Sequence, residues 1–250
     1  MILKTLASET EKENRKQLTK LSIESPIPQN EKISQTAVFL KRQELTKILF
    51  LNELYQKVGK IHGVIIEFGC RWGQNLVTLT NLRGIHEPYN YNRKIIGFDT
   101  FEGFPNTDKK DGTNSYIQKG AFGVTEGYDQ YIKSLLQCHE NESPLPHIKK
   151  TEIIKGDASI ELKKYLERNP QTVIAMAYFD FDLYEPTKKC LELIQPHLVR
   201  GSIIAFDELN DPGFPGETIA VMETLGLANI SLKRNKYAAM QSYIEYKNGN

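Results

Sequence analysis

The sequence has few cysteines and no excess of either charge. Cys70, Cys138 and Cys190 are its only cysteines, and none belongs to a Cys-x-x-Cys pair, which argues against a disulfide framework and a zinc site. A reducing cytoplasm is the predicted location. Because 32 basic residues balance 31 acidic ones and no long basic stripe occurs, nucleic acid and anionic membrane are poor candidates for partners. A small or neutral acceptor fits better.

Long apolar runs are also missing. Nowhere do about 18 apolar residues follow one another, as a membrane-spanning helix requires. Residues 1–15 are mostly polar and lack the apolar centre of a secretory signal. We therefore expect a soluble protein. With 250 residues and 40% apolar content, the chain can bury one large core, and no shift in composition marks a second one.

Strand-like apolar runs alternate with segments of helical periodicity along most of the chain. The expected strands are 64–68, 94–98, 152–155, 173–179, 202–206, 230–234 and 238–246. The expected helices are 31–60, 72–83, 125–140, 159–168, 186–198 and one that ends near residue 226. This order predicts an α/β fold: a doubly wound, mostly parallel, seven-stranded sheet with helices on both faces and one antiparallel strand at its end.

The N-terminal part is expected to lie outside this sheet. Residues 1–60 form a predicted helical extension, and residues 61–250 form the predicted domain that carries the function. Residues 1–24 are charged and sparsely apolar, so they are either a frayed arm or a helix that packs on a partner subunit. The second reading predicts a homo-oligomer formed through the N-terminal helices.

The segment Val64-Ile-Ile-Glu-Phe-Gly-Cys-Arg-Trp-Gly73 is the most informative in the chain. A β-branched run ends in an acid and leads into two glycines, as in a strand that turns tightly into a helix beside a nucleoside ligand. The spacing is not the Gly-x-Gly-x-x-Gly of dinucleotide sites, which favours S-adenosylmethionine over NAD. The alternative is a tight turn that binds nothing.

Acidic residues follow almost every expected strand, where ligands of doubly wound sheets bind. They are Glu67, Asp99, Asp157, Asp180 with Asp182, and Asp207 with Glu208. Crowded carboxylates repel one another unless a ligand hydroxyl or a cation satisfies them. A single acid at a strand end can instead cap a helix, and for Asp157 that alternative is as good as a functional one.

These acids suggest two uses. Asp99 ends the strand beside the glycine loop, where a carboxylate can bind both ribose hydroxyls. Asp180, Asp207 and Glu208 come from adjacent strands and offer three hard oxygen ligands, which suits Mg²⁺ or another divalent cation. No histidine or cysteine joins them, so zinc is disfavoured. The alternative again is that these acids cap helices.

Three motifs resemble the macrocin O-methyltransferase family: Ile95-Ile-Gly-Phe-Asp-Thr-Phe-Glu-Gly-Phe-Pro105, Asp180-Phe-Asp-Leu-Tyr-Glu-Pro-Thr187 and Gly201-Ser-Ile-Ile-Ala-Phe-Asp-Glu208. They occur in family order, and the resemblance spans roughly residues 41–224. It implies a class I, metal-dependent sugar O-methyltransferase with a Rossmann-like fold, in which Asp180, Asp207 and Glu208 bind the metal and Asp99 binds the ribose. The chain departs from the family's usual Asp-Asp at Asp207-Glu208 and from its Asp-Gly-Asp at residues 180–182.

The chemistry would be an in-line displacement at a sulfonium, which needs an aligned acceptor oxygen and a group that takes its proton. The candidate base is Asp182 or a carboxylate of the metal site. In an extended chain Asp182 would point to the same side as Asp180; the alternative for Asp182 is a helix cap. Residues 100–127, rich in glycine and aromatic side chains, are interpreted as a lid over the acceptor. Lys109, Lys110 and Lys119 in the lid favour an acceptor with phosphate.

The predicted function is therefore methyl transfer from S-adenosylmethionine to a sugar hydroxyl of a nucleotide sugar, glycoside or glycan precursor, assisted by a divalent cation. The candidate cofactor-binding residues are Glu67, Gly69, Arg71, Gly73, Asp99, Thr100, Asp157 and Ala158, and the candidate catalytic residues are Asp180 and Asp182. Two alternatives stay open: a catechol-type O-methyltransferase acting on a phenolic diol, and a noncatalytic protein that binds S-adenosylmethionine. An NAD-dependent reductase is less favoured, because the chain lacks the glycine spacing of such enzymes and a plausible Tyr-x-x-x-Lys pair.

Overall fold

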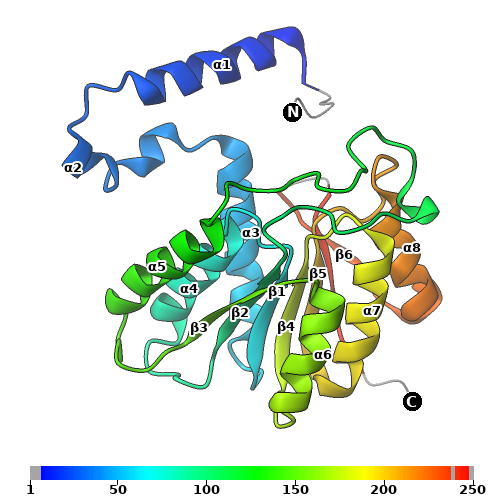
Figure 1. Cartoon of the computed structure of the whole chain (residues 1–250). Coiled ribbons are helices and arrows are strands. Elements are labelled where there is room, and N and C mark those ends of the chain that lie inside the picture. The colour runs from blue at the N-terminus through cyan, green and yellow to red at the C-terminus, as the bar shows by residue number, and fades with distance from the viewer. Residues whose placement is uncertain (1–6, 238–239, 248–250) are drawn as a thin grey trace. The chain divides into compact units, whose positions relative to one another are not determined.

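The computed structural model describes residues 7–237 and 240–247 (Figure 1). The chain divides into two compact units, Met1–Lys47 and Ile48–Asn250. The predicted boundary at residue 60 stays a prediction. Among the described residues, no helix combines the length and the apolar character needed to cross a bilayer.

The N-terminal unit consists of short helices: α1 (Glu9–Ile23), α2 (Gln29–Lys32), η1 (Thr36–Phe39) and the start of α3 (Arg42–Val58). Ser8 and Glu11 form a capping box that begins α1. The expected single helix over 31–60 is wrong. The backbone at Leu40 is extended (ψ 117°), so the chain straightens before α3 although the apolar spacing continues through it.

The second unit contains a seven-stranded sheet in the order β3-β2-β1-β4-β5-β7-β6. Its strands are β1 (Val64–Phe68), β2 (Ile95–Asp99), β3 (Thr151–Lys155), β4 (Ile174–Phe179), β5 (Leu198–Phe206), β6 (Lys233–Arg234) and β7 (Ser242–Glu245). The first five strands are parallel, and β7 is antiparallel to both β5 and β6. The mostly parallel fold is thus confirmed.

One detail of the predicted topology is wrong. The antiparallel strand does not lie at the end of the sheet, because β7 inserts between β5 and β6 and leaves the two-residue β6 at the edge. Ser242–Glu245 pairs with residues 203–206 of β5, whose side chains are buried. Residues 238–239 of the expected last strand lie outside the described residues.

Helices cover both faces of the sheet (Figure 1). The C-terminal part of α3, α4 (Gln74–His86) and α5 (Tyr128–Asn141) pack on one face. The helices α6 (Ala158–Arg168), α7 (Tyr184–Ile194) and α8 (Pro215–Thr224) pack on the other. Shorter turns complete the unit: η2 (Lys109–Asp111), η3 (Gln195–His197) and η4 (Leu227–Asn229). All residues of β4 are buried, as expected for a central parallel strand.

The expected helix over 186–198 starts earlier and ends sooner. Pro186 is the third residue of α7 rather than the first, a place in the first turn where its missing N–H leaves no helical bond unmade. The last residues of the expected segment form η3 and the start of β5.

Candidate active site

The glycine loop connects β1 with α4. Gly69 and Gly73 have positive φ angles of 83° and 77°, and Arg71 between them has a φ of 46°. A Cβ at Gly69 would overlap the carbonyl oxygen of Asp180, and a Cβ at Gly73 would lie 2.6 Å from Ile132 Cδ1. Contact with the Asp180 backbone therefore requires glycine at residue 69, whereas at residue 73 the positive φ is the main constraint; the role of both glycines in ligand approach stays a prediction.

Asp99 holds the glycine loop in place. Its carboxylate accepts the backbone N–H of Arg71 at 2.7 Å and that of Phe101 at 2.5 Å. Burial raises the pKa of Asp99, and these hydrogen bonds oppose the rise. The neighbouring Thr100 hydroxyl donates to the Gly103 carbonyl at 2.7 Å. Asp99 thus joins the glycine loop to the start of the lid, and ribose binding stays its predicted role.

The other candidate cofactor residues come from β1 and α6. Glu67 is buried in β1 between Gly97 and Tyr178. Asp157 is the N-cap of α6, since its carboxylate accepts the N–H of Ser159 at 2.9 Å and the hydroxyl at 2.7 Å.

Ala158 is the buried first residue of α6. The helix cap that is the alternative role for Asp157 is therefore present. Cofactor binding by Asp157 or Ala158 stays a prediction.

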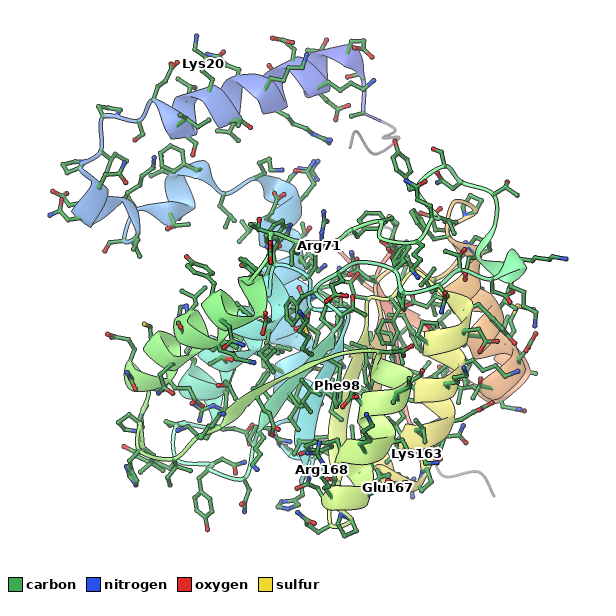
Figure 2. All side chains as sticks on the ribbon, in the orientation of Figure 1. Lys20, Arg71, Phe98, Lys163, Glu167 and Arg168 are labelled. Atoms are coloured by element: carbon green, nitrogen blue, oxygen red, sulfur yellow. The ribbon has the colours of Figure 1, made fainter. Side chains whose placement is uncertain are left out.

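Figure 2 shows which end of the sheet carries the candidate site residues. Arg71 lies at the end of the sheet where β1 leads into the glycine loop, and Phe98 lies within the sheet. Lys163, Glu167 and Arg168 lie at the opposite end, on α6. The candidate site residues lie at or just after the carboxyl ends of β1, β2, β3, β4 and β5, the edge where doubly wound sheets bind ligands.

Three of the predicted acids meet at the ends of β4 and β5. One carboxylate oxygen from each of Asp180, Asp207 and Glu208 lies within 4.8 Å of the others. Asp207 accepts the Tyr178 hydroxyl at 2.5 Å, which orients its carboxylate. Burial, then the neighbouring Asp182, raises the pKa of Glu208 well above its usual value. The predicted grouping of these acids is therefore present.

Asp182 joins this cluster by a different route from the expected one. Its φ of 61° is left-handed, so residues 180–182 are not extended and the argument from strand alternation is wrong. It nevertheless lies near the Glu208 side chain, whose pKa it helps to raise after burial. The helix-cap alternative is also wrong, because the N-cap of α7 is Leu183 and the first N–H of the helix donates to Asp111.

Glu217, which no sequence pattern indicated, is a further member of the cluster. It is fully buried in α8, and its carboxylate accepts the Glu208 N–H at 3.3 Å. Burial and the neighbouring Asp182 and Asp180 raise the pKa of Glu217 well above its usual value. An acid in the first turn of a helix normally faces water, so its spacing gave no signal of burial.

The predicted lid packs partly against itself. Phe101 and Phe104 are buried, and Phe104 packs with Ala121. The Arg71 guanidinium lies 5.2 Å from the centre of the Phe122 ring, so the glycine loop contacts the lid. Lys110 Nζ lies 2.5 Å from a carboxylate oxygen of Glu223. One of the three lysines expected to favour phosphate is therefore already paired with an acid.

A seven-stranded sheet with this order, an acidic carboxyl edge and a glycine loop after β1 defines the class I methyltransferases. No family model and no curated protein matches the chain, so the family assignment rests on solved structures. CalS11, described as a calicheamicin methyltransferase, aligns with a TM-score of 0.94 and 43% identity over 97% of this chain and 95% of its own.

A second CalS11 structure, described as an apo TDP-rhamnose 3′-O-methyltransferase of calicheamicin biosynthesis, aligns with a TM-score of 0.85 and 41% identity. That alignment covers 97% of this chain and 96% of the other. The O-methyltransferase NovP, at a TM-score of 0.58 and 17% identity over 80% of this chain and 79% of its own, shows the fold alone. The chain belongs to the family of sugar O-methyltransferases that includes CalS11, and the predicted resemblance and enzyme class are confirmed.

Proposed function

We propose that this enzyme transfers the methyl group of S-adenosylmethionine to a hydroxyl of a nucleotide-linked deoxysugar, with a divalent cation held by Asp180, Asp207 and Glu208. The observation that carries the proposal is the meeting of these three carboxylates at adjacent strand ends, in a chain that is 43% identical to CalS11 over nearly its whole length.

The donor set fits a hard cation. All three side chains offer carboxylate oxygen, and two of them, Asp207 and Glu208, are consecutive residues after β5. Burial first, and then the neighbouring acids, raise the pKa of Glu208, and a bound cation would offset both effects. When bound, such a cation would polarise an acceptor hydroxyl and lower its pKa.

Asp182 is proposed as the group that takes the proton of the acceptor hydroxyl. It lies 8% exposed beside Glu208 and is part of the acidic cluster. Asp180 and Asp207 would position the acceptor oxygens, because they follow neighbouring parallel strands and are held by the sheet. A base fixed next to the acceptor needs no rearrangement before it accepts the proton.

The proposed S-adenosylmethionine site is the loop after β1 with the ends of β2 and β3. The residues proposed to line it are Glu67, Gly69, Arg71, Gly73, Asp99, Thr100, Asp157 and Ala158. Asp99 accepts N–H donors from the loops beside it, and a carboxylate, with about four acceptor positions, can also accept a ribose hydroxyl. The methionine end would then lie next to the glycine loop.

The acceptor proposal comes from CalS11, a TDP-rhamnose 3′-O-methyltransferase. We therefore propose a nucleotide-activated deoxyhexose with neighbouring hydroxyls. A transfer assay should compare TDP-rhamnose, simple rhamnosides and a catechol as acceptors for labelled S-adenosylmethionine. Preference for the nucleotide sugar supports the proposal, preference for the catechol supports the phenolic alternative, and cofactor binding without transfer to any acceptor supports a noncatalytic role.

A further inference from the structure

Asp111 is a buried carboxylate in the lid that the proposed chemistry does not use. Its side chain is 1% exposed. One oxygen accepts the N–H of Asp108 in the lid at 2.6 Å, and the other accepts the N–H of Tyr184, the first residue of α7, at 2.6 Å. A buried carboxylate is costly without such donors, so these two hydrogen bonds are what allow Asp111 to be buried here.

The contact with Tyr184 caps a helix from a distance. The N-cap of α7, Leu183, has no side-chain hydrogen bond to offer the first turn. Asp111 supplies that bond from a segment 73 residues earlier in the chain. Tyr184 follows Asp182 and Leu183 directly, so the lid is fastened to the loop that carries Asp180 and Asp182.

The start of α8 meets the same point. A Cβ at Gly216 would overlap Asp111 Oδ1 and lie 2.6 Å from the Tyr184 nitrogen. The next residue, Glu217, accepts the N–H of Glu208. The lid, the loop after β4 and the helix that supports the loop after β5 therefore meet around Asp111.

We propose that Asp111 is a positioning residue for methyl transfer: it fastens the lid to the loops that carry Asp180, Asp182 and Glu208, so that lid closure and the geometry of the acidic site are coupled. This inference rests on the proposed function. The neighbouring ion pair of Lys110 with Glu223 also joins the lid to α8, but both side chains are exposed by more than a third and contribute less.

The test compares Asp111→Ala with Asp111→Asn in the full chain. Alanine removes both acceptors, whereas asparagine keeps one acceptor for the Tyr184 N–H. With Asp111→Ala we expect faster hydrogen exchange at the Tyr184 amide and in residues 104–122. We also expect kcat/KM for the nucleotide sugar to fall by about 10- to 100-fold, since small displacements of reacting groups are costly. The dissociation constant for S-adenosylmethionine should change by less than about twofold, and asparagine should recover part of the loss.

Asp108→Ala is the matched control. Asp108 lies in the same turn, and its carboxylate accepts the N–H groups of Lys110 and Asp111 within that turn. This variant should keep the acceptor kinetics of the wild type. If Asp111→Ala instead speeds exchange at Tyr184 while kcat and KM for the acceptor stay at wild-type values, the positioning role is overturned. Unchanged exchange at Tyr184 would overturn the contact itself.

A readout without turnover separates this inference from the proposed function. Mn²⁺ binding, measured by calorimetry on the full chain, should weaken by about tenfold in Asp111→Ala, because the loops that carry the ligands lose their support. If the wild type binds Mn²⁺ but methylates no sugar, the proposed function fails while this comparison still decides the role of Asp111. Equal Mn²⁺ affinity in the wild type and Asp111→Ala would count against it.

Discussion

Gly69 connects the glycine loop to the acidic site. Its φ of 83° and the close approach of the Asp180 carbonyl oxygen leave no room for a Cβ. A residue of the predicted cofactor loop thus also constrains the backbone of the first candidate metal ligand. A change at this position should disturb both.

We expect Gly69→Ala to lower the free energy of unfolding by about 3 kcal/mol, of which about 1–2 kcal/mol comes from the left-handed backbone and the rest from the overlap with Asp180. Gly127→Ala is the control, because its φ of 76° is similar and nothing lies within 4 Å of its Cβ. Urea denaturation measures both. Equal losses in the two variants would show that the contact with Asp180 does not constrain this position.

The position of an individual acid could be predicted from the sequence only where it directly follows a recognisable strand. Asp180 and Asp207 end strands that alternation identifies, so their meeting at one edge was predictable. Asp111 and Glu217 are buried by contacts between segments far apart in sequence, which local spacing does not encode. The left-handed conformation of Asp182 could not be predicted either, since nothing in the sequence Asp-Phe-Asp indicates that the extended backbone ends there.

At the scale of elements, α7, α8 and the lid are joined by a charged group around Glu223. Lys110 and Lys188 contact its carboxylate at 2.5 and 2.9 Å, and the Tyr184 hydroxyl donates to it at 2.6 Å. These hydrogen bonds lower the pKa of Glu223 to about 2. A depressed carboxyl pKa adds stability above the ordinary value, and this stability is lost as the pH falls towards about 2.

The melting temperature of Glu223→Gln should therefore lie below that of the wild type at about pH 6, and the difference should shrink as the pH falls from about 4.5 towards 2. Glu192→Gln, which removes an exposed acid from α7, should show no such convergence. Added salt should reduce the effect, because the pairs are exposed. A difference that stays constant over this pH range would contradict the role of Glu223.

Elements were predictable where each strand is followed by the helix that covers it. The place of β7 was not, because the two C-terminal apolar segments are both strand-like and their pattern does not tell which of them also pairs with β5. The helix over 31–60 failed for a related reason. Apolar spacing continued through residue 40, where the backbone conformation changes.

At the scale of the whole molecule, the N-terminal unit leaves several of its apolar side chains exposed. None of α1, α2 and η1 has a buried residue. Ile23, Ile33 and Val38 are 74%, 85% and 63% exposed. Exposed apolar side chains grouped in one short segment are typical of surfaces that associate, which agrees with the predicted homo-oligomer.

We expect the full chain to be a dimer or larger in sedimentation velocity experiments. The double change Ile33→Glu with Val38→Glu should dissociate it, since charges are costly in an apolar interface. Ser34→Glu adds a charge in the same segment at an exposed polar residue and should leave the assembly intact. A monomeric wild type, or a double variant that keeps the assembly, would contradict the prediction.

The central claim is that three carboxylates at the ends of β4 and β5 hold a cation for methyl transfer to a sugar. The most direct measurement is the rate of methyl transfer to TDP-rhamnose before EDTA, after EDTA and after added Mg²⁺, in the wild type and in Asp180→Ala. We expect EDTA to abolish turnover and Mg²⁺ to restore it in the wild type. Asp180→Ala should stay below about a hundredth of the wild-type rate while still binding S-adenosylmethionine. Turnover that persists in EDTA, or an Asp180→Ala variant as active as the wild type, would contradict it.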